Sequence, residues 1–197
     1  MEAIEHIIRQ TVQQKPEGTL FFPEDFAAVG SVAGVLKALQ RLDHKGVIKR
    51  VAQGIYVRPK ISPYIGAVLP TAEEVAEAIA RRDRARTIPT GVSALNALGL
   101  STQVPMNVVL LTDGSPRAIR VGNRTIKFKK TTPRNLSAKG AVSRLVIQAL
   151  KALGNGQVSE EHEQKIIALL RTERHGDLLH DIALAPEWIQ QIMKKAL

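Results

Sequence analysis

Residues 30–58 read GSVAGVLKALQRLDHKGVIKRVAQGIYVR, and this stretch decides the fold that we predict for the first part of the chain. Ser31 can begin a helix, because its hydroxyl accepts a backbone N–H that has no partner inside the helix. Gly46 follows where a helix C-cap residue is expected. Between them runs an apolar stripe at helical spacing, of which we expect Leu36, Leu39 and Leu42 to be core residues. Its members are Val32, Val35, Leu36, Leu39 and Leu42.

Two short β-prone runs follow this helix, residues 47–52 and 55–58, and Gln53-Gly54 between them predicts a tight hairpin. The opposite face of the helix is small at its start and then basic, from Ala33 to Lys45. A polar, basic helix followed directly by a basic hairpin is the layout of a winged helix-turn-helix. In that layout the helix enters the major groove of DNA and the hairpin lies along the DNA backbone.

The segments before residue 30 complete such a domain. We predict a helix over residues 2–14, a short strand over 19–22, and a second helix over 23–29 with Pro23 at its first position. Gly30 then supplies the turn into the third helix. The sequence therefore predicts a winged helix-turn-helix domain over residues 1–60.

Prolines at 59, 63 and 70 bracket an extended connector, so we place a linker at 61–70 and a second domain at 71–197. The second domain is expected to be mixed α/β with a basic β-hairpin and a helical tail, which makes the whole chain α+β. Its expected helices are 72–83 after a Thr71 cap, 91–98, 138–153, 159–174, 176–184 and 186–196; its expected strands are an interior strand at 107–112 and a hairpin at 117–130 that turns at Gly122-Asn123.

The net charge of +10 is unevenly distributed along the chain. It is +3 over residues 1–60, +7 over 61–140 and zero over 141–197. Two positive stretches favour a polyanionic partner, although a solvated basic surface is the simpler explanation. The absence of cysteine excludes disulfides and thiolate metal sites and fits a cytoplasmic protein. We expect neither an export signal nor a membrane-spanning segment.

The first basic stretch supplies the candidate DNA contacts. We expect Ser31, Lys37, Gln40 and Arg41 to face the groove, with Gln40 and Arg41 as candidates for bidentate contacts to base edges. The expected phosphate contacts are Lys45, Lys49, Arg50 and Gln53. Tyr56 is expected to pack on the hairpin. A protein-interaction module remains the alternative use of this fold.

The second basic stretch lies in the predicted hairpin and leaves three interpretations open. It is a solvated sheet surface, an extension of the DNA footprint, or a site for another polyanion such as RNA. Its residues are Arg117, Arg120, Arg124, Lys127, Lys129 and Lys130, with Arg134 and Lys139 following.

Catalysis is not expected from this sequence. Asp113 follows a strand, as a nuclease carboxylate would, but the hairpin after it contains no acid, and we interpret Asp113 as a turn residue. The histidines lack metal-ligand spacing apart from the weak His175–His180 step, and there is no phosphate-binding glycine-rich loop. We therefore expect no cofactor and no metal.

Three segments resemble the AbiEi-type antitoxins of bacterial type IV toxin–antitoxin systems. They are ALQRLDHKGVIKRVAQGIYVRPK (38–60), TGVSALNALGLSTQVPMNVVLLTDG (90–114), in which LGLSTQVP-to-TDG is the most specific part, and APEWIQQI (185–192). The resemblance implies a phage-defence antitoxin that represses its own operon by binding operator DNA. It also implies a nucleotidyltransferase-type toxin as functional partner, and in this family a stable complex of the two is generally not needed. Direct neutralisation of a partner protein and RNA binding by the second domain are the alternatives.

Overall fold

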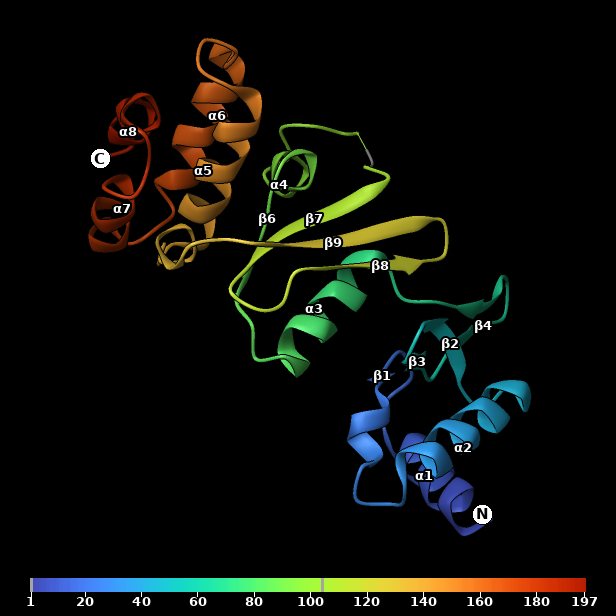
Figure 1. Cartoon of the computed structure of the whole chain (residues 1–197). Helices are drawn as coiled ribbons and strands as arrows, with labels where there is room; N and C mark the ends of the chain where they lie inside the picture. The colour runs from blue at the N-terminus through green and yellow to red at the C-terminus, as the bar shows by residue number, and fades with distance from the viewer. Residues whose placement is uncertain (1, 104) are drawn as a thin grey trace. The chain divides into compact units, whose positions relative to one another are not determined.

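A computed structural model describes residues 2–103 and 105–197 (Figure 1). Met1 and Val104, the latter within the LGLSTQVP segment, lie outside the described residues. The fold is mixed α+β, as expected. The chain divides into two compact units: one holds the chain up to Ile79 together with Ile119–Asn123, and the other holds Ala80–Ala118 and Arg124–Leu197. No helix in the described part of the chain is long and apolar enough to cross a membrane.

The first unit begins with helices and a small antiparallel sheet. Its elements are α1 (Glu2–Gln14), β1 (Leu20–Phe21), the 3₁₀ helix η1 (Pro23–Phe26), α2 (Val32–His44), β2 (Lys49–Ala52) and β3 (Ile55–Val57). The three strands are ordered β1-β3-β2, and β3 pairs antiparallel with both neighbours. The hairpin predicted at Gln53-Gly54 is confirmed, and Gly54 adopts a φ of 68° there.

The α-helix predicted over 23–29 is wrong, because this segment forms only a short 3₁₀ helix. The Asp25 carboxylate accepts the Phe22 N–H at 2.8 Å, and the backbone bonds from Ala27 to Glu24 and from Val29 to Phe26 close three-residue turns. Such i→i+3 bonds make the tighter helix that occurs in short pieces. The segment still places Phe26 in the core, where its ring stacks on Phe21 with the centroids 6.0 Å apart.

The buried face of α2 is narrower than its apolar stripe. Val35, Ala38, Leu39 and Leu42 are at most 1% exposed and pack in a core with Ile8 and Val12 of α1. Assigning Leu36 to the core was wrong: its side chain is 42% exposed, and Val32 is 73% exposed. The buried positions repeat at i, i+3, i+4 and i+7, and Leu36 falls beside this face rather than on it.

A small hairpin occupies the segment expected to be an extended connector. It pairs β4 (Lys60–Ser62) with β5 (Gly66–Val68), and Ile61, Tyr64 and Ile65 are exposed along it. The next helix, α3 (Ala72–Arg82), starts as predicted at Thr71. The Thr71 N–H donates to Glu74 and the Glu74 N–H donates to the Thr71 hydroxyl, at 2.7 and 3.2 Å, which is a complete capping box.

A four-stranded sheet with the order β6-β7-β9-β8 follows. Its strands are β6 (Thr87–Pro89), β7 (Asn107–Thr112), β8 (Arg117–Val121) and β9 (Arg124–Lys130), and the short helix α4 (Val92–Ala97) lies between β6 and β7 in the chain. β7 pairs antiparallel with β6 and parallel with β9, so it is the interior strand that its apolar sequence predicts. Gly122 turns the predicted hairpin with a φ of 58°.

The helical tail packs in a core that it shares with α4, in which Val146, Leu150, Ile166, Leu170, Ile189 and Met193 are fully buried. It contains the 3₁₀ helix η2 (Pro133–Leu136) and the α-helices α5 (Ala141–Leu153), α6 (Glu160–Leu170), α7 (His175–Ile182) and α8 (Glu187–Lys194). The four predicted helices are therefore present, with the first one starting at Ala141 rather than Ala138.

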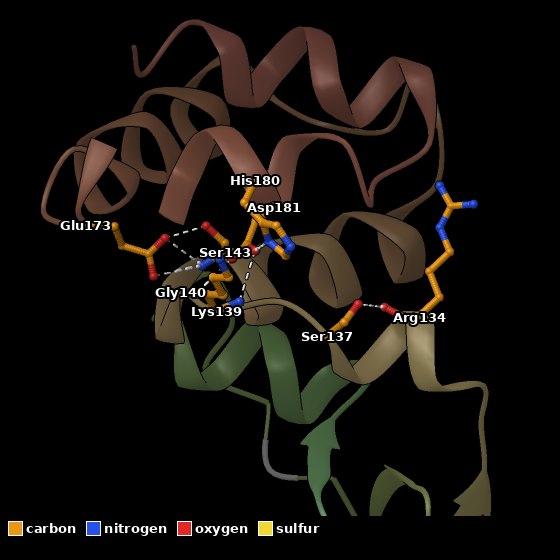
Figure 2. Close-up of polar contacts among 8 residues, drawn as sticks. All are labelled: Arg134, Ser137, Lys139, Gly140, Ser143, Glu173, His180 and Asp181. Carbon is orange, nitrogen blue, oxygen red and sulfur yellow. Dashed lines mark hydrogen bonds and ion pairs between the residues drawn. The ribbon is translucent and has the colours of Figure 1, made fainter. Parts of the chain in front are cut away.

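Two carboxylates from other segments set the start of α5 (Figure 2). The fully buried Asp181 of α7 accepts the N–H groups of Lys139 and Gly140, at 2.9 and 2.7 Å, and contacts the His180 ring. Glu173 accepts the Val142 N–H at 2.6 Å and also the N–H and hydroxyl of Ser143. The first N–H groups of α5 have no partners inside the helix, so Glu173 satisfies two of them, while Asp181 holds the two N–H groups just before the helix. Both acids oppose the positive end of the helix dipole.

Candidate nucleic-acid interface

The outer face of α2 is exposed and chemically mixed. Leu36, Lys37 and Gln40 all project into solvent, with Val32 and Ala33 exposed in the first turn. Leu36 and Gln40 are four residues apart and therefore lie on the same side of the helix. Neither Lys37 nor Gln40 makes a hydrogen bond or an ion pair within the described residues. The face thus offers an amide, an ammonium group and aliphatic carbon, all accessible to a partner.

Ser31 lies at the start of this face and is already engaged. Its side chain accepts the Gly34 N–H at 3.2 Å, which is the N-cap bond that the sequence predicts. Ser31 is exposed and its hydroxyl is also a donor, so it can donate one further hydrogen bond to a partner.

Glu5 of α1 holds Arg41 and Lys45, which sequence reasoning treated as available for DNA. Its two carboxylate oxygens lie 2.5 Å from Arg41 Nε and from Lys45 Nζ. Hydrogen bonds from Lys45 and Arg41 lower the pKa of Glu5 below its ordinary value of 4.5, so Glu5 stays ionised near neutral pH. Because 36 residues separate Glu5 from Arg41, no local pattern pointed to this ion pair.

The hairpin β2–β3 carries the remaining candidate contacts. Lys49, Arg50 and Gln53 are exposed, with Gln53 in the turn. The backbone N–H of Arg50 donates to Asp43 at 3.0 Å, which ties the start of the hairpin to the last turn of α2. The Arg50 Nε donates to the Ala52 carbonyl at 3.3 Å, which leaves its terminal nitrogens for phosphate contacts. Tyr56 is 5% exposed and packs in the core, as expected.

The second basic stretch divides into engaged and accessible cations. Arg117 forms an ion pair with Asp83 and lies over the Phe128 ring, 5.4 Å from its centroid. Arg120, Arg124 and Lys130 donate to the carbonyls of Gly122, Pro105 and Asp113, at 3.1–3.2 Å.

Lys127 and Lys129 differ from these four side chains. Both are exposed on β9, and within the part of the chain that the structure describes neither makes a hydrogen bond or an ion pair. Arg117 and Arg124 are half-buried and help to hold the fold, whereas Lys127 and Lys129 are exposed and free to bind a polyanion.

Comparison with protein families places the chain. A family model described as "Family of unknown function (DUF6088)" matches residues 7–178. The chain belongs to the DUF6088 family. No curated protein matches the sequence. Among solved structures, the DUF6088 chain is similar to the RV2827C protein from Mycobacterium tuberculosis, with 16% identity, a TM-score of 0.45, and coverage of 100% of this chain and 82% of that one.

The Asp113 carboxylate of this DUF6088 chain forms an ion pair with Arg86. It accepts the Arg86 N–H and Nε, both at 2.8 Å, and these bonds lower the pKa of Asp113 below 3.8. Asp113 is thus a turn residue that holds the neighbouring loop, as interpreted from sequence. Within residues 2–103 and 105–197 no three His, Asp or Glu side chains gather in a way that could hold a metal ion.

Proposed function

We propose that this protein is a sequence-specific DNA-binding repressor whose first unit is a winged helix-turn-helix. The order α1, β1, η1, α2, β2, β3, with the sheet order β1-β3-β2, supports this proposal, because it matches the element order of that fold. In this assignment α2 enters the major groove and the β2–β3 hairpin lies along the phosphates.

The outer face of α2 is the observation that carries the proposal. A buried or purely charged face would suggest packing or non-specific attraction, but here a glutamine and a lysine stand beside exposed aliphatic side chains. Glutamine bonds adenine bidentately, lysine bonds guanine, and aliphatic carbon packs on the thymine methyl. Lys49 and Arg50 on the adjoining hairpin suit phosphate contacts, which position the protein without specifying sequence.

The test is binding of the purified protein to its own upstream DNA and to a scrambled duplex, at two salt concentrations. A preference for the upstream sequence that persists at the higher salt is expected. The double variant Lys37→Glu and Gln40→Ala should lose that preference, while Lys15→Glu, which reverses one charge outside α2 and the hairpin, should retain it. If the protein binds both duplexes equally and its affinity falls steeply with salt, the binding is non-specific and driven by counterion release.

The antitoxin role is the second part of the proposal and rests on the resemblance to AbiEi-type antitoxins. We infer a cytoplasmic, non-catalytic protein that counteracts a nucleotidyltransferase-type toxin encoded beside it. Co-expression of this protein with that toxin should relieve the growth arrest that the toxin causes. A complex that survives high salt during purification would favour direct neutralisation of the toxin instead.

RNA binding by the second unit is the competing candidate, and the exposed Lys127 and Lys129 favour it. Replacing both with glutamine should then abolish protection against the toxin and leave repression unchanged. If protection and repression are lost together, the two roles do not reside in separate surfaces.

A further inference from the structure

The β4–β5 hairpin exposes apolar side chains that nothing in the described chain covers. Tyr64 and Ile65 in its turn are 94% and 75% exposed, and Ile61 on β4 is 64% exposed. Val68 and Leu69 at its end are exposed as well. Contiguous apolar surface of this kind marks an interaction site. The hairpin follows β3 in the first unit and is separate from both α2 and the β2–β3 hairpin (Figure 1).

The backbone of this hairpin also has room for another strand. β4 and β5 form three antiparallel residue pairs centred on Ile61 and Ala67. No other strand in residues 2–103 and 105–197 pairs with either of them. An isolated two-stranded hairpin is at most marginally stable in water, and an open strand edge is a template for a further strand. Addition of a strand would therefore stabilise the hairpin and cover its apolar side chains.

The charge of the hairpin indicates the kind of partner. Residues 61–72 contain no charged side chain, although the whole chain has a net charge of +10. A nucleic acid or an acidic protein surface would find one cation on this hairpin, Lys60. The surface therefore suits an uncharged partner. Two copies of this strongly basic chain can meet here without bringing like charges together.

Strand geometry selects β5 as the edge for such a contact. A twofold axis through Ala67 pairs β5 antiparallel with β5 of a second copy, which places Gly66 opposite Val68. The two Lys60 side chains then lie on the outer strands, three strand spacings or roughly 14 Å apart, which exceeds the Debye length of about 8 Å. Pairing through β4 would instead make the two Lys60 side chains diagonal neighbours about 7–8 Å apart. β5 also lacks the charges and prolines that protect edge strands from pairing.

We propose that β5 is the contact between two copies of this chain, which add strand to strand into a four-stranded sheet of order β4-β5-β5-β4. Ile61 and Ala67 are paired on adjacent strands and share one face of the hairpin. In the dimer this face joins the same face of the second copy, so the central four side chains form one apolar strip. The twofold contact presents two first units to a partner, which goes beyond the proposed repressor role.

Sedimentation of the full chain over about 1–100 μM tests the contact, with a dimer expected at the higher concentrations. Ala67→Lys and Ala67→Glu should each be monomeric, because each variant places two like charges opposite one another with Cβ atoms about 4.5–5.5 Å apart. An equimolar mixture of the two variants should dimerise again, with a Kd at least about tenfold lower than that of either variant alone. Ala168→Lys adds the same charge at an exposed position of α6 and should leave the wild-type dimer unchanged.

Three outcomes would overturn the proposal. A wild-type protein that stays monomeric over the whole range has no such contact. Dimerisation of Ala67→Lys with the wild-type Kd would place the contact on another surface. A mixture of the Lys and Glu variants that stays monomeric would show that the two copies of residue 67 do not meet. Circular dichroism of each variant verifies that it is folded, and because no DNA enters the experiment, its outcome is independent of the repressor test.

Discussion

Val32 and Leu36 expose aliphatic carbon on the side of α2 that also carries Gln40. If α2 reads DNA, these side chains can pack on thymine methyl groups, and burying one methyl contributes about 0.8 kcal/mol, or about fourfold in Kd. Replacing thymines in the operator with uracil should weaken binding by about this factor per contacted position. Leu36→Ala should bind both DNAs equally; an unaltered thymine preference in that variant would exclude Leu36 as the contact.

Glu5 restrains two cations that would otherwise be available to phosphates. Glu5→Gln should release Arg41 and Lys45, because the amide keeps the shape of the carboxylate and loses its charge. We expect tighter DNA binding at low salt and a log–log salt slope steeper by about 0.9 for each cation that gains a phosphate contact. Glu17→Gln, an exposed acid with the same change of charge, is the control. Equal effects of the two variants would assign the gain to net charge alone.

At the scale of elements, the start of α5 depends on acids far away in the sequence. Asp181 is fully buried and accepts two backbone N–H groups of the segment before α5. Asp181→Ala should therefore cost about 2–4 kcal/mol of the free energy of unfolding, measured by urea denaturation. Glu161→Ala, an exposed acid in the first turn of α6, should cost less than about 1 kcal/mol. Similar losses in both would show that α5 starts without this support.

The end of α3 is joined to β8 by an ion pair that makes stability depend on pH. Burial alone would raise the pKa of Asp83, but hydrogen bonds from Arg117 and Arg82 outweigh it and hold the pKa below 3.8. The ionised form is thus favoured in the folded state, so this stabilisation is complete above about pH 4 and is lost as pH falls through the lowered pKa. The difference in unfolding free energy between wild type and Asp83→Asn should shrink from pH 6 to pH 3. A constant difference would contradict the assignment.

At the scale of the whole molecule, the outer face of α2 and the exposed pair Lys127 and Lys129 belong to different compact units. Replacing Lys127 and Lys129 with glutamine should therefore weaken RNA binding and leave the preference for operator DNA unchanged, whereas Lys37→Glu should do the reverse. Each variant removes or reverses a surface charge, so comparing both readouts separates a local contact from a general effect of net charge. Loss of both activities in either variant would argue against two independent sites.

Local sequence determined most of the elements. The Ser31 and Thr71 caps, the Gln53-Gly54 and Gly122-Asn123 turns and the interior strand β7 are all confirmed. Each depends on side chains within a few residues of the backbone that they shape. The same local reasoning was wrong at residues 23–29, because Asp25 turned back to the chain and closed a tighter turn.

Tertiary structure decided which chemical groups remain accessible. Periodicity assigned Leu36 to the core, but the width of the face that α1 covers leaves it in solvent. The sequence predicted both Arg41 and Lys127 as cations available to a polyanion. In the structure Glu5 forms an ion pair with Arg41, whereas no described side chain pairs with Lys127. Composition and spacing thus specified the elements and the total charge, while long-range packing decided where that charge is available.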